Sequence, residues 1–306
     1  MAAGAELLTR LFTSEIQPKL FPSNSFLSRS MNDDQYVNVN TVELAHSGAI
    51  PEVKVDRTIL PAPIAKRTDV ATNYSIEELT TDPTLLQDSE ALVVAYQKRA
   101  SILDQHIKVQ RQKMGNRALY KWAAGASSFR ASTGTTRAAG GPAQTGNRKG
   151  FGIADILAVQ QRFFADDVQA DLEEINGIAV MTPRQYSDLL AIAQFTDADK
   201  YGSSAIPSGV VRRAFGFDIY VRSQVVVLDS SDALKAEGAT GATGDQDAAI
   251  FYSPSYVRRA VGAIKTYVDS DKPEYYGSIF STMVRFGAIA ARNDNKGVYL
   301  LFEDTV

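Results

Sequence analysis

The sequence predicts an α+β protein, and three observations carry this prediction. An apolar stripe of helical spacing runs along residues 84–122, which indicates one long helix. β-Branched side chains are concentrated in residues 36–59, which is typical of strands. The chain ends in further strand-like segments at residues 261–268, 278–292 and 297–302. A chain of 306 residues with 44% hydrophobic content can bury a substantial core around such elements.

Composition and charge exclude several classes of protein. The 32 basic side chains nearly balance the 35 acidic ones, so the formal net charge of -3 argues against a dedicated nucleic-acid binder. The lack of cysteine excludes disulfide frameworks, thiolate nucleophiles and cysteine-based zinc sites, and it suits a reducing cytoplasm. Glu6, Arg10 and Glu15 interrupt the apolar start, so we expect no signal peptide. No run of about 18 apolar residues occurs, so we expect no membrane span.

The first elements are predicted to be an apolar arm and a long hairpin. Apolar side chains recur at helical spacing within residues 7–12, and Pro18 and Pro22 then impose an extended course. A terminal helix packed on its own core is the alternative for this segment. Residues 36–44 and 53–59 alternate partially and are joined by a turn-prone segment, so they predict a hairpin. An isolated hairpin is marginal in water, so it must lie on its own domain or on a neighbouring chain.

The long helix has two possible starts. Asp82 is a plausible N-cap with Pro83 at the first helical position, and residues 88–90 offer a second start. At 1.5 Å per residue the helix would span roughly 45 to 60 Å. Its apolar stripe consists of Leu92, Tyr96, Ala100, Leu103, Ile107, Met114, Ala118 and Trp122. Its other faces carry mostly basic residues, which favours either a solvated surface or pairing with acidic residues of an adjacent subunit.

A flexible loop and a compact region of helices and strands follow the long helix. Residues 125–150 are rich in Ala, Gly, Ser and Thr and contain no acidic residue, so we predict a long flexible loop. Residues 153–164 have a helical pattern, residues 177–181 read as an apolar strand, and Thr182 with Pro183 begins another helix. Further strands are predicted at residues 215–220, 224–228 and 248–253.

The search for catalytic chemistry yields no site. His46 and His106 lack the spacing of a metal site or of a Ser-His-Asp triad, so we interpret each as a surface or structural histidine. Residues 141–149 have the glycine spacing of a phosphate loop, but Asn147 and Arg148 stand where Lys and Ser or Thr are needed. Adjacent acidic residues in polar stretches are more often solvated surface than acid-base pairs. We therefore assign no catalytic, cofactor-binding or metal-ligating residue.

Several stretches resemble one known family. They are QPKLFPSNSFLSRS at residues 17–30, RTDVATNYSIEELTTDP at 67–83, AYQKRASILDQHI at 95–107, AFGFDIYVRSQV at 214–225 and EYYGSIFSTMVRFGAIAARNDNKGV at 274–298. Together with the order of the predicted elements, they resemble the Hong Kong 97-type major capsid protein of tailed phages, especially a branch common in phages of Bacteroidetes. The resemblance covers essentially the whole chain, although its motifs are soft patterns of apolar and turn residues.

The resemblance implies an α+β, Hong Kong 97-like fold with a defined set of parts. These would be an N-terminal arm at residues 1–35, an extended loop at 36–75, a peripheral domain at 76–149 with its spine helix at about 84–122, an axial domain at 150–253 and peripheral return strands at 254–306. In such shells the extended loop lies over a neighbouring subunit, which would support the hairpin in trans.

The resemblance also implies a function and a set of partners. The chain would self-assemble, as hexamers and pentamers, into an icosahedral phage head that encloses double-stranded DNA without sequence specificity. It would form part of the virion, assemble in the host bacterial cytoplasm, need no cofactor, contact no membrane and have no enzymatic activity. No scaffolding segment is recognised before the arm, so we expect a separate scaffolding protein, with a portal and possibly a decoration protein. An encapsulin-like nanocompartment shell and an α/β enzyme with a dispersed carboxylate site are the alternatives.

Contacts between subunits are predicted at the arm, the loop and the long helix. The candidates are Leu7, Leu11, Phe12, Phe21 and Phe26 in the arm, Val37, Val39, Val53 and Val55 in the loop, and Arg99, Arg111 and Arg117 on the helix. If the arm is exposed, Phe26→Asp should leave the monomer folded and suppress particles.

Overall fold

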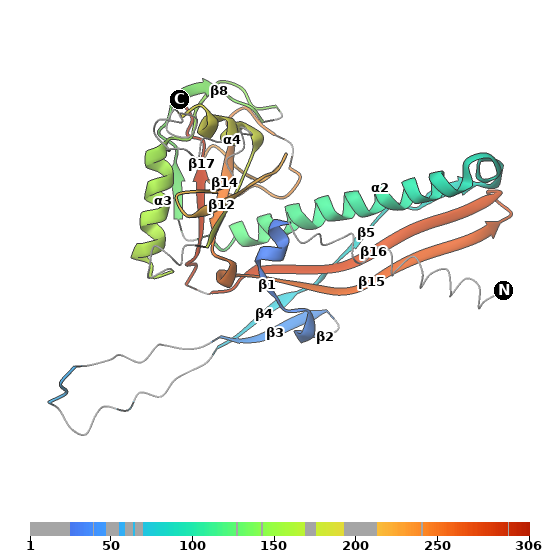
Figure 1. Ribbon diagram of the computed structural model, residues 1–306, viewed down its shortest axis with the longest axis horizontal. Coiled ribbons are helices and arrows are strands. Elements are labelled where there is room, and N and C mark those ends of the chain that lie inside the picture. The colour runs from blue at the N-terminus through green and yellow to red at the C-terminus, as the bar shows by residue number, and fades with distance from the viewer. Residues whose placement is uncertain are drawn as a thin grey trace, which may run out of the picture.

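The computed structural model describes residues 25–38, 40–46, 55–58, 64, 70–126, 128–141, 143–168, 176–192, 213–239, 241–292 and 294–306. In Figure 1 a compact part holds the helices α3 (Ile153–Ala165) and α4 (Pro183–Leu190), and an elongated part holds the long helix α2 (Asp88–Ala123) beside the strands β15 (Val257–Lys272) and β16 (Gly277–Ala290). The mixture of helices and sheets confirms the predicted α+β class.

The long helix is α2 (Asp88–Ala123), and the described side chains of its apolar stripe are buried. These are Leu103, Ile107, Met114, Ala118 and Trp122. The predicted start at residue 84 is wrong, because residues before Asp88 form strand β6 (Thr84–Gln87). The backbone of β6 pairs with a neighbouring strand and the Leu86 side chain is buried, and this tertiary pairing overrides the capping signal of Asp82 and Pro83.

A five-stranded sheet supports α2 along its length. Its strands are β1 (Met31–Asn32), β15 (Val257–Lys272), β16 (Gly277–Ala290) and β5 (Glu77–Thr80) in that order, with β6 also paired to β16. Phe280, Val284 and Phe286 of β16 share one buried cluster with the stripe of α2. The helix therefore covers one face of this sheet, and the predicted strands at residues 261–268 and 278–292 are confirmed.

A seven-stranded sheet forms the centre of the compact part. Its order is β11 (Arg213–Ala214), β12 (Phe217–Val221), β10 (Gly177–Met181), β14 (Gln246–Tyr252), β17 (Val298–Phe302) and β7 (Ser128–Ala131), with β13 (Val226–Leu228) paired to β14. Alternate residues of the central strands face two different cores. Val180 and Ile250 lie in the cluster that contains Trp122 of α2, whereas Met181 and Phe251 lie in a second cluster with α3 (Ile153–Ala165).

Burial on both faces explains why the central strands read as continuous apolar runs. The predicted helices are confirmed as α3 and α4 (Pro183–Leu190), and Thr182 caps α4 as expected. The Thr182 side chain accepts a hydrogen bond from the Gln185 amide, and the Gln185 side chain accepts one from the Thr182 amide.

Two segments assigned to the peripheral domain contribute strands to the seven-stranded sheet, namely β17 and β7, while β8 (Thr136–Ala138) and β9 (Asn147–Lys149) pair with each other in a separate two-stranded sheet. β17, predicted as a peripheral return strand, pairs with β14 and with β7. Residues 125–150, predicted as a flexible loop, contain β7, β8 and β9. Short strands held by long-range pairing leave no periodic apolar signal, which is why this composition suggested a loop.

The hairpin at the base of the extended loop is closed by different strands from those predicted. β3 (Thr41–His46) lies between β2 (Val37–Asn38) and β4 (Val70–Ser75), and His46 is paired with Val70. The predicted return strand at residues 53–59 is wrong, because the described residues 55–58 form no strand. Val42 and Tyr74 pack on Ala260 of β15, so this three-stranded base sheet is supported by its own chain.

Candidate assembly surfaces

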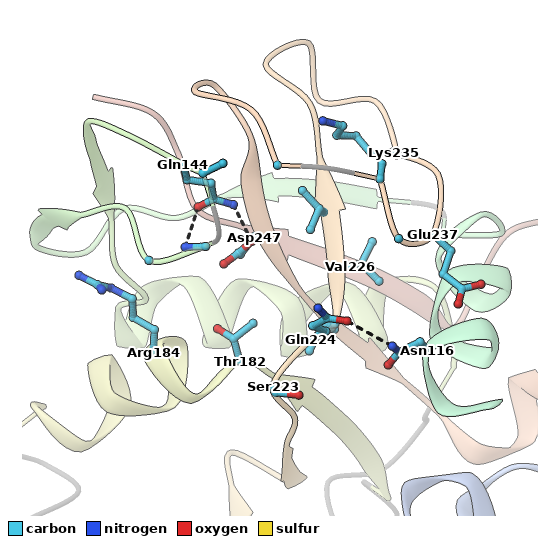
Figure 2. Close-up of a pocket in the computed structure, with 18 of the residues that line it drawn as sticks. Asn116, Gln144, Thr182, Arg184, Ser223, Gln224, Val226, Lys235, Glu237 and Asp247 are labelled. Carbon is cyan, nitrogen blue, oxygen red and sulfur yellow. Dashed lines mark hydrogen bonds between the residues drawn. The ribbon is translucent and has the colours of Figure 1, made fainter. Parts of the chain in front are cut away.

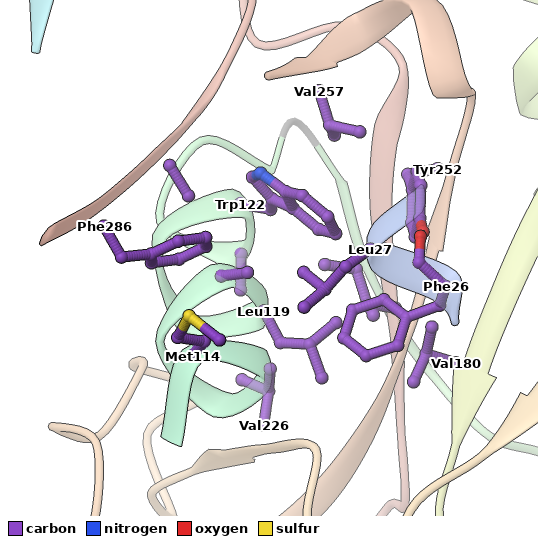
Figure 3. Close-up of a cluster of buried hydrophobic side chains, with 14 of the residues drawn as sticks. Phe26, Leu27, Met114, Leu119, Trp122, Val180, Val226, Tyr252, Val257 and Phe286 are labelled. Carbon is purple, nitrogen blue, oxygen red and sulfur yellow. The ribbon is translucent and has the colours of Figure 1, made fainter. Parts of the chain in front are cut away.

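The start of the described chain is anchored inside its own core. Phe26 is 3% exposed, and its ring meets Trp122 edge-on with 6.1 Å between centroids (Figure 3). Tyr252 donates a hydrogen bond to the Phe26 carbonyl over 3.1 Å, and the Arg222 guanidinium lies 5.0 Å from the Phe26 ring centroid. The prediction that Phe26 is an exposed contact residue is therefore wrong, because the pocket between α2 and β14 buries it.

The remaining arm candidates lie outside the described residues. They are Leu7, Leu11, Phe12 and Phe21. The same holds for Val39 and Val53 of the loop, while Arg99 lies within α2 at a position whose side chain is not described.

The other two loop candidates occupy different environments. Val37 is partly buried against the cluster of the base sheet, whereas Val55 is 85% exposed. Ile64, which lies between β3 and β4 in the sequence, is 99% exposed. These exposed β-branched side chains can contact another molecule. Burial of their apolar surface would stabilise such a contact by about 25 cal/mol for each Å² removed from water.

Three basic residues of α2, Lys113, Arg117 and Lys121, form ion pairs within the chain. Arg117 donates two hydrogen bonds of 2.5 Å to the Glu77 carboxylate of β5, and it also contacts Glu237 at 3.2 Å. Lys121 pairs with Glu77 at 3.1 Å, and Lys113 pairs with Glu237 at 2.6 Å. Hydrogen bonds from Arg117 lower the pKa of Glu77 to about 2. The predicted role of Arg117 between subunits is corrected to an intrachain clamp.

Arg111 remains exposed on the surface of α2, as its prediction requires.

The buried histidine of this helix, His106, contacts the hydroxyls of Thr81 at 2.7 Å and Thr84 at 3.0 Å. Burial lowers the pKa of His106. This confirms the interpretation of His106 as a structural histidine.

An apolar surface that the sequence analysis missed lies at the far end of the long strands. Tyr275 and Tyr276 sit in the turn between β15 and β16 and are exposed, Tyr276 by 80%. Tyr267 and Leu85, on the sheet face opposite α2, are also partly exposed. The signal was present in the sequence as two adjacent aromatic residues, Tyr275 and Tyr276, directly before Gly277, which begins β16.

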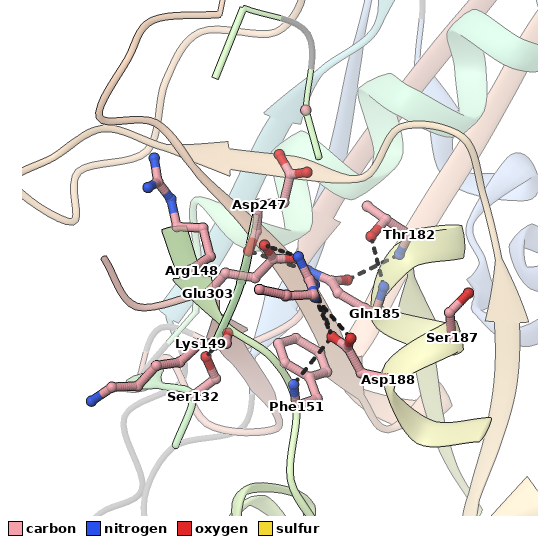
Figure 4. A network of polar contacts seen from close by, with 12 residues as sticks. Ser132, Arg148, Lys149, Phe151, Thr182, Gln185, Ser187, Asp188, Asp247 and Glu303 are labelled. Carbon is pink, nitrogen blue, oxygen red and sulfur yellow. Dashed lines mark hydrogen bonds and ion pairs between the residues drawn. The ribbon is translucent and has the colours of Figure 1, made fainter. Parts of the chain in front are cut away.

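A buried charged cluster fastens the segment after α2 to the compact part (Figure 4). Arg137 of β8 contacts Asp188 of α4 and Glu303 after β17, each at 2.8 Å. The backbone amide of Phe151 also donates to Asp188 over 3.3 Å. Burial raises the pKa of Glu303. These contacts hold residues 128–151 in place, which is the physical reason that they do not form the predicted flexible loop.

A cavity of about 720 Å³ bears on the enzyme alternative (Figure 2). Its acidic lining residues are Glu237 and Asp247. Glu237 is bound by Lys113 and Arg117, and Asp247 accepts a hydrogen bond of 2.8 Å from Gln144. Each of these two carboxylates is thus held by side chains of the same protein.

Within the part of the chain that the structure describes, no group of three or more His, Asp or Glu side chains could hold a metal ion. No described helix is both long and apolar enough to cross a membrane.

Comparisons with known proteins agree with an assembly role. The sequence model of a family described as "Phage capsid protein" matches residues 101–301. The asymmetric unit of the mature capsid of bacteriophage PhiM1 is similar, with a TM-score of 0.62 and 12% identity over 92% of this chain and 87% of that one. The capsid of cyanophage P-SCSP1u has a TM-score of 0.60 and 14% identity over 90% and 86% of the two chains.

A third similar structure is a virus-like particle from Pyrococcus furiosus. Its TM-score is 0.51, with 11% identity over 96% of this chain and 99% of that one. No curated protein matches the sequence. At these identities the structures establish a shared fold, and the family match establishes membership because it covers more than half of the chain. The chain therefore belongs to the phage capsid protein family and is a structural subunit of a phage capsid.

Proposed function

We propose that this subunit is the major one of an icosahedral phage head, arranged as hexamers and pentamers around double-stranded DNA. The observation that carries the proposal is the shape of the single chain. α2 and the β15–β16 hairpin extend away from the compact part, and the described loop residues 55–58 and 64 are exposed (Figure 1). A subunit with such projections can overlap its neighbours, and many modest contacts can then add up to a stable shell.

We infer that the extended loop lies across a neighbouring subunit. The base sheet is fixed to its own chain through Val42 and Tyr74, while Val55 and Ile64 are almost fully exposed. The support in trans proposed for the whole hairpin therefore applies to the part beyond the base sheet. The charged residues Asp56 and Arg57 directly follow the apolar Val55, which suits a contact that is apolar at its centre and polar at its rim.

The loop contact can be tested by substitution with matched controls. The double variant Val55→Ser and Ile64→Ser should lower the yield of shells, because it removes apolar area that a neighbour would bury. The melting temperature of the unassembled protein should stay unchanged, since both side chains are already exposed. Val306→Ser, at an exposed position on the compact part, is the matched control. Normal shell yield from the double variant would contradict the loop contact.

The remaining partners follow from the same proposal. We expect a separate scaffolding protein, a portal and possibly a decoration protein, with assembly in the host bacterial cytoplasm. Enclosure of DNA without sequence specificity is consistent with a net charge of -3 and with the neutralisation of Arg117, Lys113 and Lys121 by Glu77 and Glu237. Tight, salt-sensitive DNA binding by the unassembled subunit would contradict a lining that packs DNA without trapping it.

A nanocompartment shell is the second candidate, favoured by the likeness to the virus-like particle from Pyrococcus furiosus. Both candidates make this chain a shell subunit without catalytic activity of its own. The contents of particles purified from the natural source separate them, because a phage head encloses DNA and a nanocompartment encloses a protein cargo. Membership of a branch found in phages of Bacteroidetes stays a prediction.

A further inference from the structure

One buried carboxylate joins three stretches of the chain that are far apart in sequence. The Asp33 side chain is 2% exposed. Its Oδ1 accepts a hydrogen bond of 2.8 Å from Arg258 Nη1 of β15, and its Oδ2 accepts one of 3.0 Å from the Tyr74 hydroxyl of β4. The segment that follows Phe26, the five-stranded sheet of β1, β15, β16, β5 and β6 (the peripheral sheet) and the base of the extended loop therefore meet at Asp33.

The backbone around Asp33 is fixed to the peripheral sheet. β1 pairs in parallel with β15, and the Asp33 amide donates to the Arg259 carbonyl over 2.9 Å. The Asp33 carbonyl accepts from the Tyr36 amide over 2.9 Å, and the Asp34 side chain accepts from the Val261 amide over 2.6 Å. Because these bonds hold Asp33 relative to β15, the carboxylate is a fixed point against which the base sheet can be oriented.

The rest of the contact between the base sheet and the peripheral sheet is small and apolar. Its buried members are Val42, Tyr74, Ile76 and Ala260. The Tyr74 ring lies close to Gly287 of β16, where an added Cβ would approach the ring to 3.1 Å and would have to push it away by a few tenths of an ångström. Apolar packing has no preferred direction, whereas a hydrogen bond to a carboxylate does. The Tyr74 hydroxyl therefore supplies the directional part of this contact.

The geometry points to Asp33 as a positioning residue that fixes, through Tyr74, the angle at which the base of the extended loop leaves the peripheral sheet. Residues 47–69 connect β3 to β4 in sequence, so the orientation of the base sheet sets where this connection starts and where it returns. The consequence for assembly rests on the proposed loop contact, while the orientation itself is a property of the single subunit.

Spin labelling of the unassembled subunit tests the orientation directly. The natural chain has no cysteine, so Ala71→Cys on β4 and Lys265→Cys on β15, both exposed, give two labels without background. We expect the distance distribution between the labels to shift or broaden in Tyr74→Phe, which removes the hydroxyl and keeps the ring. Asp33→Asn should give the same change and provides a second route if one variant folds poorly.

Tyr299→Phe is the matched control. The Tyr299 hydroxyl also donates to a carboxylate, Asp166, over 2.7 Å, but it lies in the compact part away from the loop. Tyr74→Phe and Tyr299→Phe should lower the melting temperature to a similar extent. Only Tyr74→Phe should change the label distances, and only Tyr74→Phe should weaken assembly, by about fivefold per subunit if one net hydrogen bond is lost.

The possible outcomes separate this inference from the proposed function. Unchanged label distances in Tyr74→Phe and Asp33→Asn would overturn the positioning role, whatever happens to the shells. Changed distances with normal shell formation would support the positioning role of Asp33 and overturn the proposed contact between the loop and a neighbour. Changed distances together with weakened assembly in Tyr74→Phe alone would support both.

Discussion

Phe26→Ala distinguishes an anchored start of the chain from an exposed arm. The side chain is 3% exposed and contacts Trp122, so its removal loses the transfer free energy of a phenyl ring and leaves a cavity. For buried phenylalanines this costs about 3 to 5 kcal/mol. Loss of the Arg222 contact over the ring should add about 0.5 to 1 kcal/mol. Together these lower the free energy of unfolding by about 5 kcal/mol.

Urea unfolding of the unassembled subunit, followed by the fluorescence of the single tryptophan, measures this loss. Tyr276→Ala is the matched control, because that aromatic residue is 80% exposed and its removal should cost less than about 0.5 kcal/mol. Phe26→Asp should prevent folding rather than spare the monomer, because it places a charge in the same pocket. An unchanged unfolding midpoint for Phe26→Ala, with loss of shells, would refute the anchored position and restore the exposed arm.

Three further changes test the charged and close-packed contacts. Glu77 has a pKa of about 2 against an ordinary 4.5, so its stabilising effect is complete above pH 4.5 and is lost as the pH falls towards 2. Glu77→Gln should therefore flatten the dependence of stability on pH in that window. Because solvent partly screens the pair, the substitution should cost about 1 kcal/mol of stability at pH 7. If urea titrations gave the same dependence of the free energy of unfolding on pH as in the natural chain, the clamp would be contradicted. Arg137→Ala should cost about 3 kcal/mol at pH 7, because it leaves Asp188 and Glu303 without their cation, and the loss should shrink as the pH falls through the raised pKa of Glu303. Arg292 forms a more exposed pair with Asp294. If calorimetry showed that Arg137→Ala loses no more stability than Arg292→Ala, this account would be contradicted. Gly287→Ala should displace the Tyr74 ring and expose the base sheet to protease, and an unchanged cleavage rate would argue against the close approach.

Local patterns in the sequence were sufficient for the presence of the helices and for the longer apolar strands. The apolar stripe of α2, the cap of α4 at Thr182 and the apolar runs of β10 and β14 follow from spacing and residue type alone. The start of α2 was misplaced because strand pairing along β16 decides the conformation of residues 84–87. The capping residues Asp82 and Pro83 do not reveal whether the residues after them form a helix or pair with β16.

Contacts between distant segments were the part that the sequence could not supply. Residues 53–59 have the same β-branched character as β4, so propensity alone does not choose the partner of β3. Arg137 lies in a stretch without periodicity, and its partners Asp188 and Glu303 come from elements far along the chain. Burial of Phe26 depends likewise on Trp122 and Tyr252, which only the folded chain brings to it.

Electron cryomicroscopy of the recombinant protein after assembly tests the central claim most directly. The account predicts closed shells in which loop residues 55–58 are buried against a neighbouring subunit, while Phe26 stays in the core of its own chain. A protein that remains a monomer at high concentration, or shells in which those loop residues face only solvent, would contradict it.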